Sequence, residues 1–176
     1  MKTYFKLSGL VLLFLLTVLA VYLLSLRFSD GPVEFYPWFT ISYGGPFRTG
    51  ELTTAPSSWE SIKDFEEIEF QTLQPAISRT VWLSIYDGRL FIVSGYMRSG
   101  LGRLWKQWPH YIEDDDRIIL RIADKLYEQR MERILEGPEV VPVMTELSRK
   151  YGNGGPGSSV PVEQGFVWMF EVLPRQ

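Results

Sequence analysis

The sequence predicts a mainly β fold of the α+β class, in which an N-terminal transmembrane helix precedes a small antiparallel β-barrel with two or three short helices. Three observations predict it: an uncharged apolar run near the N-terminus, six short β-rich runs beyond it, and turn signals between several of those runs. Only short helical patterns separate the β-rich runs, whereas a βαβ fold would alternate strands with long helices. The barrel is therefore expected to be closed or half-open.

The amino-acid composition excludes several kinds of functional site. The chain has 176 residues, no cysteine and a single histidine, His110. Without cysteine it has no disulfide, thiolate metal site, cysteine nucleophile or lipid-modified cysteine. One histidine is too few for a histidine-built zinc site, and no metal site is predicted.

Residues 1–27 are interpreted as a membrane anchor. Between Lys6 and Arg27, residues 7–26 carry no charge and are dominated by Leu and Val. An α-helix over this range is about 30 Å long, which matches the hydrocarbon thickness of a bilayer. A signal peptide has a shorter apolar region followed by a cleavage site, and a buried core helix has a polar face. The lipid bilayer is thus the expected partner of residues 7–26.

The charges beside the apolar run predict its orientation. Lys2, Lys6 and the terminal amine precede the run, whereas Arg27 follows it and is soon balanced by Asp30. Positive charge favours the cytoplasmic side of a membrane. We expect a single-pass protein of the cell (inner) membrane, with a cytoplasmic N-terminus and a periplasmic or extracellular domain.

The net charge of the remaining domain argues against nucleic-acid binding. Lys2, Lys6 and Arg27 are three of the 18 basic residues, so the domain keeps 15 basic and all 21 acidic residues, a net charge of −6. Nucleic-acid binding requires a basic face that displaces counterions. No nucleic-acid partner is predicted.

Residues 28–56 are predicted to form a juxtamembrane arm rich in glycine, proline and aromatic residues. Pro37 and Pro46 exclude a regular helix there. The aromatic rings of the arm either pack on the barrel or lie at the lipid headgroups, and the sequence leaves both alternatives open. The barrel domain is assigned to residues 57–176.

The barrel domain is predicted to begin with a short helix and a strand. Ser57 and Glu60 fit a capping box, which predicts a helix through about Asp64. In residues 68–72 apolar and polar side chains alternate, the pattern of a half-buried strand.

The strongest local pattern predicts a β-hairpin. Residues 79–86 and 89–94 are β-rich and are joined by Asp87-Gly88. This dipeptide favours the positive φ angles that a two-residue hairpin turn requires.

Helical spacing follows the hairpin. The apolar residues of 101–112 lie at helical intervals, interrupted or restarted at Pro109. A second antiparallel strand pair is predicted over residues 118–122 and 126–134, around a turn at residues 123–125.

The C-terminal part is predicted to contain one more helix and one more strand. Pro138 or Pro142 opens a helix that ends near Tyr151, where Gly152 stops it. A loop rich in Gly, Pro and Ser leads to a last strand over residues 166–173.

The order of these elements resembles the flavin-binding split β-barrel superfamily, which includes pyridoxamine-phosphate-oxidase-like and deazaflavin-dependent nitroreductase-like proteins. The resemblance covers residues 60–174. It is carried by the segments Arg79-Thr80-Val81-Trp82, 90–95, the short helix with Arg103, Trp105 and Lys106, 117–122, and Phe166-Val167-Trp168. It implies that the small antiparallel barrel is a split β-barrel.

The resemblance also implies a site for FMN or a deazaflavin. Six residues occupy the matching positions: Arg79, Thr80, Ser94, Gly95, Arg103 and Lys106. In such a site Ser94 and Gly95 would contact the cofactor phosphate, and Arg103 or Lys106 would neutralise it. Because the superfamily commonly builds this site between two subunits, a homodimer is expected.

The residues themselves point to an anion site without reference to the resemblance. Residues 88–112 contain Arg89, Arg98, Arg103 and Lys106 but no acidic residue. Glycines in the same segment would let backbone N–H groups approach an anion. The alternative is a solvated loop whose basic residues pair with the acidic run at residues 113–116.

Other candidate residues are assigned no site role. Trp105 and Trp108 could stack on a planar ring, but their helical spacing favours core packing. His110 has no identified partner and is interpreted as a surface residue rather than a general acid or base. No catalytic residue is predicted.

Two functions fit these observations. The leading hypothesis is a membrane-anchored split-barrel protein that binds a flavin or deazaflavin and has a redox role. The alternative is a cofactor-free, envelope-associated interaction or structural module. Because fold resemblance does not establish a reaction, the sequence does not decide whether the protein is an enzyme.

Overall fold

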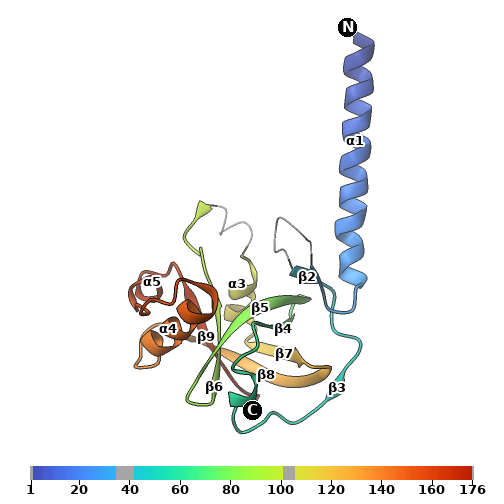
Figure 1. The fold of residues 1–176 in the computed structure, drawn as a ribbon. Coiled ribbons are helices and arrows are strands. Elements are labelled where there is room, and N and C mark those ends of the chain that lie inside the picture. Colours follow the sequence, from blue (N-terminus) through green and yellow to red (C-terminus); the bar gives the residue numbers. More distant parts are fainter. Residues whose placement is uncertain (1, 35–41, 101–105, 176) are drawn as a thin grey trace.

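A computed structural model describes residues 2–34, 42–100 and 106–175 of the chain. Helix α1 (Lys2–Ser25) projects away from a β-barrel, and a short 3₁₀ helix, η1 (Leu26–Phe28), joins the two parts (Figure 1). Within these ranges α1 is the one helix that is long and apolar enough to cross a membrane. By length and composition α1 is therefore a candidate membrane span.

Six strands close the barrel in the order β5-β4-β7-β8-β9-β6, and β6 pairs back with β5. Their bounds are β4 (Glu67–Leu73), β5 (Ala76–Tyr86), β6 (Arg89–Ser94), β7 (Arg117–Ile122), β8 (Lys125–Ile134) and β9 (Trp168–Pro174). Every pairing around the barrel is antiparallel. The predicted fold class and its six strands are confirmed.

Both predicted hairpins are present, each with a two-residue turn. Asp87 (φ 51°) and Gly88 (φ 71°) join β5 to β6, and Tyr86 lies opposite Arg89. Ala123 and Asp124 also have positive φ and join β7 to β8, so Lys125 belongs to β8 rather than to the turn. Positive φ at both turn residues matches the right-handed twist of the paired strands.

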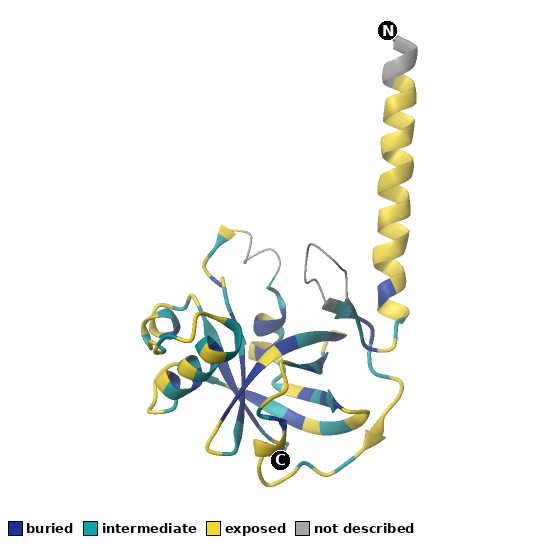
Figure 2. Cartoon of the chain, viewed as in Figure 1, coloured by how far each residue is buried: buried dark blue, intermediate teal, exposed yellow. Residues whose placement is uncertain are grey.

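The barrel interior forms the main hydrophobic core. Phe70, Leu83 and Phe170 are fully buried there. Helix α3 (Trp108–Asp114) packs against this core with Trp108, whose ring centroid lies 5.0 Å from that of Phe70. Figure 2 shows the buried residues concentrated on the barrel strands, with α1 exposed from Lys6 onward. The expected core packing of Trp108 is confirmed.

A second apolar cluster lies on the outer face of the barrel. Helices α4 (Val140–Tyr151) and α5 (Val160–Glu163) cover it. Val143 of α4 packs with Phe91 of β6 and Met169 of β9. The predicted end of α4 at Tyr151 is confirmed, because the N–H of Gly152 donates to the carbonyl of Ser148 at 3.0 Å.

The described part of residues 28–56 packs on the barrel. It contributes β1 (Pro32–Glu34), β2 (Ser42–Gly44) and β3 (Glu51–Leu52), of which β2 pairs with β5 and β3 pairs with β8. The N–H of Phe47 donates to Gln71 Oε1 at 2.6 Å, and the guanidinium of Arg121 lies 4.3 Å from the Phe47 ring centroid. The rings at residues 35–39 lie outside the described residues.

Three boundaries differ from those expected. The predicted helix from Ser57 to Asp64 is only a 3₁₀ turn, η2 (Glu60–Ile62), because the N–H of Trp59 donates to Gly88 O at 2.8 Å and ties the segment to the hairpin. Strand β9 begins at Trp168 because α5 and a following turn occupy the chain as far as Gly165. Helix α3 begins at Trp108, and residues 101–105 of the predicted helical pattern lie outside the described residues.

The turn between α1 and the barrel is closely packed and yields a test. A Cβ atom on Gly45 would lie 2.4 Å from the carbonyl oxygen of Arg27 and 2.5 Å from that of Ser29. We predict that Gly45→Ala lowers the free energy of unfolding by about 1–3 kcal/mol, because backbone must move to relieve the contact. Thermal unfolding of the full-length protein in detergent, followed by near-ultraviolet circular dichroism, measures the change.

Gly155 supplies the matched control for this substitution. No atom lies within 4 Å of a Cβ placed there. Gly155→Ala should therefore leave the unfolding temperature unchanged. An equal effect of the two substitutions would contradict the predicted clash.

Candidate functional site

A cavity of about 520 Å³ lies beside β5, the end of β6 and helix α4. Four of the six residues that the resemblance assigned to a cofactor line it: Arg79, Thr80, Gly95 and Lys106. Ser94 is buried and is not among the residues that line the cavity, and its Oγ lies 3.3 Å from Met97 Sδ. Arg103 lies outside the described residues. Strand β5 and the segment after β6 thus bring together residues that are separated in the sequence.

Arg79 is the fourth of the 11 residues of β5, and the alternation of the strand sets the face on which it lies. It lies on the same face of β5 as Val81 and Leu83, which belong to the barrel core. Its Nε is buried and has no hydrogen-bond partner among the described residues. Burial lowers the pKa of Arg79 to about 10, and the groups that favour its charged form are the side chains of Tyr111 and Tyr43.

Lys106 brings a second positive charge to the same cavity. Burial lowers the pKa of Lys106, and the neighbouring positive charge of Arg79 lowers it further. Neither pKa is raised by a neighbouring carboxylate, although Glu67 also lines the cavity. Two partly buried cations therefore repel each other across a cavity, an arrangement that favours an anionic ligand.

One wall of the cavity is a flat aromatic surface. The rings of Trp82 on β5 and Tyr151 on α4 stack with their centroids 4.5 Å apart and an interplanar angle of 4°. Trp82 is 49% exposed. The hydroxyl of Tyr151 accepts the N–H of Leu83 at 3.2 Å and contacts the carbonyl oxygens of Leu83 and Glu66, while burial raises its pKa to about 12. The stacked pair is thus fixed in place.

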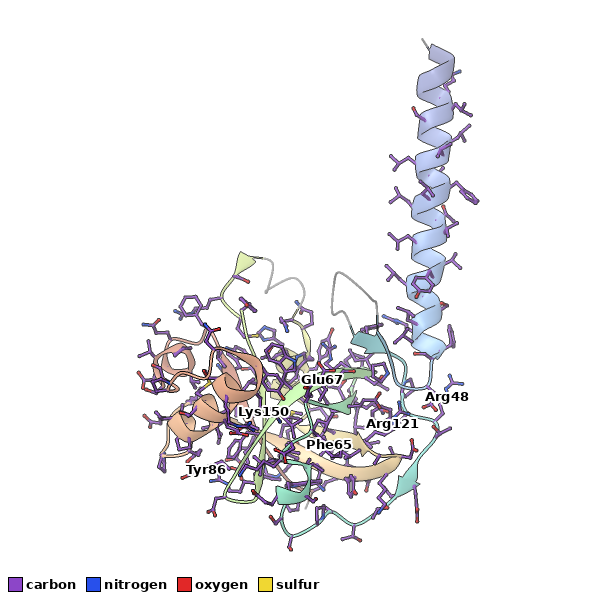
Figure 3. The ribbon with its side chains drawn as sticks, viewed as in Figure 1. Arg48, Phe65, Glu67, Tyr86, Arg121 and Lys150 are labelled. Carbon is purple, nitrogen blue, oxygen red and sulfur yellow. The ribbon has the colours of Figure 1, made fainter. Side chains whose placement is uncertain are left out.

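Lys150 fastens the end of α4 that carries Tyr151. Its Nζ donates to the carbonyl oxygens of Lys63 at 3.0 Å and Leu83 at 3.3 Å, and also to that of Phe65 (Figure 3). Burial lowers the pKa of Lys150. This ammonium group fills its hydrogen bonds with backbone oxygens, so it positions the aromatic wall and is not an available anion-binding group.

The lining combines features suited to an anion attached to a planar ring. Arg79 and Lys106 supply positive charge, and Trp82 presents a flat apolar face. The segment that carries the resemblance includes Trp82, but the resemblance implies no role for it. Its position two residues after Thr80 on the outer face of β5 is the sequence feature that indicates its place in the cavity. No sequence signal placed Tyr151 beside β5, because α4 is distant in the chain.

The alternative pairing of the basic segment with the acidic run at residues 113–116 is wrong for its described arginines. Arg89 Nε donates to Glu171 Oε1 at 2.7 Å across β6 and β9. The guanidinium of Arg98 lies 5.9 Å from the Phe166 ring centroid. The acidic run pairs with later arginines instead, as in the 2.8 Å contact between Glu113 and Arg133.

His110 does not line the cavity. Its Nδ1 lies 3.2 Å from Glu113 Oε2, and its ring meets that of Trp168 edge-on at 4.9 Å. Among the described residues no group of three or more His, Cys, Asp or Glu side chains could hold a metal ion.

The lowered pKa of Lys106 predicts an effect on protein stability that can be tested. A lysine whose pKa is lowered by folding binds its proton more weakly in the folded state, so its protonated form destabilises the fold. The penalty is full below the lowered pKa of Lys106 and fades as the pH rises toward the ordinary lysine value. We predict that Lys106→Met raises the free energy of unfolding at neutral pH by about 0.5–2 kcal/mol, with a smaller gain at alkaline pH.

Thermal unfolding across pH measures this effect, and Lys63→Met is the matched control. Lys63 is exposed and its pKa is raised, chiefly by a hydrogen bond to Glu60. Its replacement should bring no gain at neutral pH. Equal responses of the two variants would show that burial of the Lys106 ammonium group does not destabilise the fold.

Comparisons with known proteins give a limited set of matches. No protein-family model matches the sequence, and no curated protein matches it. Three similar solved structures are a conserved hypothetical protein, Rv2991, from Mycobacterium tuberculosis, a putative pyridoxamine 5'-phosphate oxidase from Listeria innocua, and an F420 reductase.

The likeness to each of these structures is at low sequence identity. Rv2991 is 17% identical with a TM-score of 0.45, and the match covers 69% of this chain and 82% of that one. The Listeria protein is 10% identical with a TM-score of 0.44, covering 65% and 88%. The F420 reductase is 16% identical with a TM-score of 0.37, covering 69% and 97%.

Proposed function

We propose that this protein is a membrane-anchored split-barrel protein that binds FMN or a deazaflavin in the cavity between β5 and α4 and has a redox role. The observation that carries the proposal is the pair of cations, Arg79 and Lys106, which line one cavity whose described lining holds a single carboxylate, that of Glu67. Buried unpaired charge costs free energy, and a bound anion offsets that cost.

The lining residues suit a phosphorylated planar cofactor. The buried Nε of Arg79 offers a free donor, and Lys106 adds charge for a phosphate group. Trp82, backed by Tyr151, offers a flat surface for a ring. A bound flavin or deazaflavin supplies hydride-transfer chemistry, while these residues bind its phosphate, orient its ring and keep water from one face.

Membrane anchoring by α1 is the second part of the proposal. The large apolar side chains of residues 7–24 are exposed in the structure, so lipid is the environment that would bury them. The flanking positive charges at Lys2 and Lys6 favour a cytoplasmic N-terminus and place the barrel on the opposite side of the membrane.

A homodimer is the third part. Trp82 at the cavity and Phe65 nearby are 49% and 42% exposed, which leaves apolar surface beside the site for a second subunit to cover. Sedimentation of the detergent-solubilised protein measures the oligomeric state.

Cofactor binding is tested by titrating the full-length protein in detergent with FMN and, separately, with a deazaflavin. We expect a dissociation constant in the micromolar range or below. Quenching of cofactor fluorescence on binding measures it. Arg79→Gln and Lys106→Gln should each weaken binding by roughly tenfold to a hundredfold, since a hydrogen bond to a charged group contributes about 1.5–3 kcal/mol.

Arg149→Gln is the control, because Arg149 lies on exposed α4 surface and pairs with Glu146. Its affinity should equal that of the unchanged protein. Thermal unfolding of each variant separates lost binding from lost folding. Failure of both cofactors to bind would favour the alternative function, a cofactor-free interaction or structural module.

A further inference from the structure

The connection between α1 and the barrel is fastened by hydrogen bonds. The buried side chain of Leu26 packs at this junction, and Ser29 Oγ accepts the N–H of Gly45 at 3.1 Å. Asp30 Oδ1 accepts the N–H of Arg48 at 2.7 Å and an N–H of Arg121 in β7 at 3.0 Å. Because no free linker follows α1, the orientation of the barrel relative to the helix is fixed. The same end of the barrel therefore faces the medium that surrounds α1.

The segment after β6 projects from that same end of the barrel. In Figure 1 it rises in the direction of α1, beyond the level at which η1 meets the barrel, and Figure 2 shows its tip exposed. Tyr96 in this segment is 76% exposed and has a φ of 62°, a strained value for a bulky residue. Backbone strain at an exposed aromatic residue is typical of a functional contact.

We call Tyr96, Arg98 and Phe166 the rim. The N–H of Met97 donates to Phe166 O at 3.0 Å, and Met97 itself is buried, so the rim is attached to the fold. Arg98 is exposed above the ring of Phe166, which is 46% exposed. Exposed aromatic rings beside arginine are the combination that proteins place at lipid headgroups.

The charge of the rim also suits an anionic surface. The segment from Gly95 to Gly100 contains Arg98 and no acidic residue, in a domain whose net charge is negative. Anionic lipid headgroups attract a basic side chain that lies near the membrane surface.

We propose that the rim contacts the anionic headgroups of the bilayer in which α1 is embedded, so that the barrel lies on the membrane with this end down. The proposal rests on the membrane-spanning role of α1 given above. Since Tyr96 also lines the cavity, that part of the cavity lining then lies near the lipid surface.

The absence of cysteine permits a direct test on the full-length protein. Gly100→Cys places one fluorophore at the tip, where an added Cβ meets no atom within 4 Å. Ser61→Cys is the matched control. Ser61 is exposed and lies in η2, beside the turn at the other end of β6. Each labelled protein is reconstituted into phosphatidylcholine and phosphatidylglycerol vesicles that contain a lipid with a shallow nitroxide quencher.

The Gly100 label should be quenched by the nitroxide lipid, and the Ser61 label only by a water-soluble quencher. Adding Arg98→Gln should reduce the population in contact by about fivefold, and Tyr96→Ser should reduce it further. Exclusively aqueous quenching of both labels would overturn the proposal, as would lipid quenching that neither substitution changes.

Flotation of the vesicles and cofactor titration separate the possible failures. Protein that does not float with the vesicles would overturn the membrane span, and the rim contact with it. Floating protein with an exclusively aqueous Gly100 label would overturn the rim contact alone. The result of the FMN titration bears on the cavity and is independent of both.

Discussion

Strand β5 is the constraint on which the rest of the structure depends. It pairs with β4 on one side and with β6 on the other, which closes the barrel and removes its open edges. One face of β5 supplies Leu83 to the core, and the other face supplies Trp82 to the stack with Tyr151. The same strand carries Arg79. Closure of the barrel therefore fixes core, aromatic wall and cation relative to one another.

The cavity differs from the rest of the barrel in its ion pairing, because the charges of Arg79 and Lys106 are not paired as those of other basic residues are. The other arginines of the barrel strands have carboxylate partners: for example, Arg89 pairs with Glu171, and Arg121 pairs with Glu69 at 2.5 Å and with Asp30 at 3.0 Å. At the cavity, burial lowers the pKa of both Arg79 and Lys106, and the charge of Arg79 lowers the pKa of Lys106 further. A fold that can pair its arginines, yet leaves two cations side by side in a cavity, sacrifices stability at that place, as binding sites commonly do.

Local patterns in the sequence were sufficient to predict the barrel strands. Period-two alternation and positive-φ turn residues such as Asp87 and Ala123 act over a few neighbours, so hairpins follow from the sequence directly. The 3₁₀ turn at residues 60–62 was missed because a hydrogen bond from Trp59 to Gly88, distant in sequence, overrides the capping pattern at Ser57. Strands β1, β2 and β3 are too short to show alternation and exist through their partners in the barrel.

The sequence predicted only some of the residues that line the cavity. Arg79, Thr80, Gly95 and Lys106 were named through their positions in a resemblance, and they do line one cavity. Ser94 was named for the same reason, yet the alternation of β6 turns its hydroxyl toward Met97. Tyr151 could not be found, because its place depends on how α4 packs across the outer face of the barrel.

Tyr96 belongs both to the cavity lining and to the exposed tip after β6, and under the proposed contact with the bilayer this position has a kinetic consequence. A molecule with a hydrocarbon tail and a planar polar headgroup would reach the cavity by lateral diffusion in the bilayer. Its supply would then be governed by two-dimensional diffusion and by its mole fraction among the lipids, while its dissolved concentration in the surrounding water would matter little.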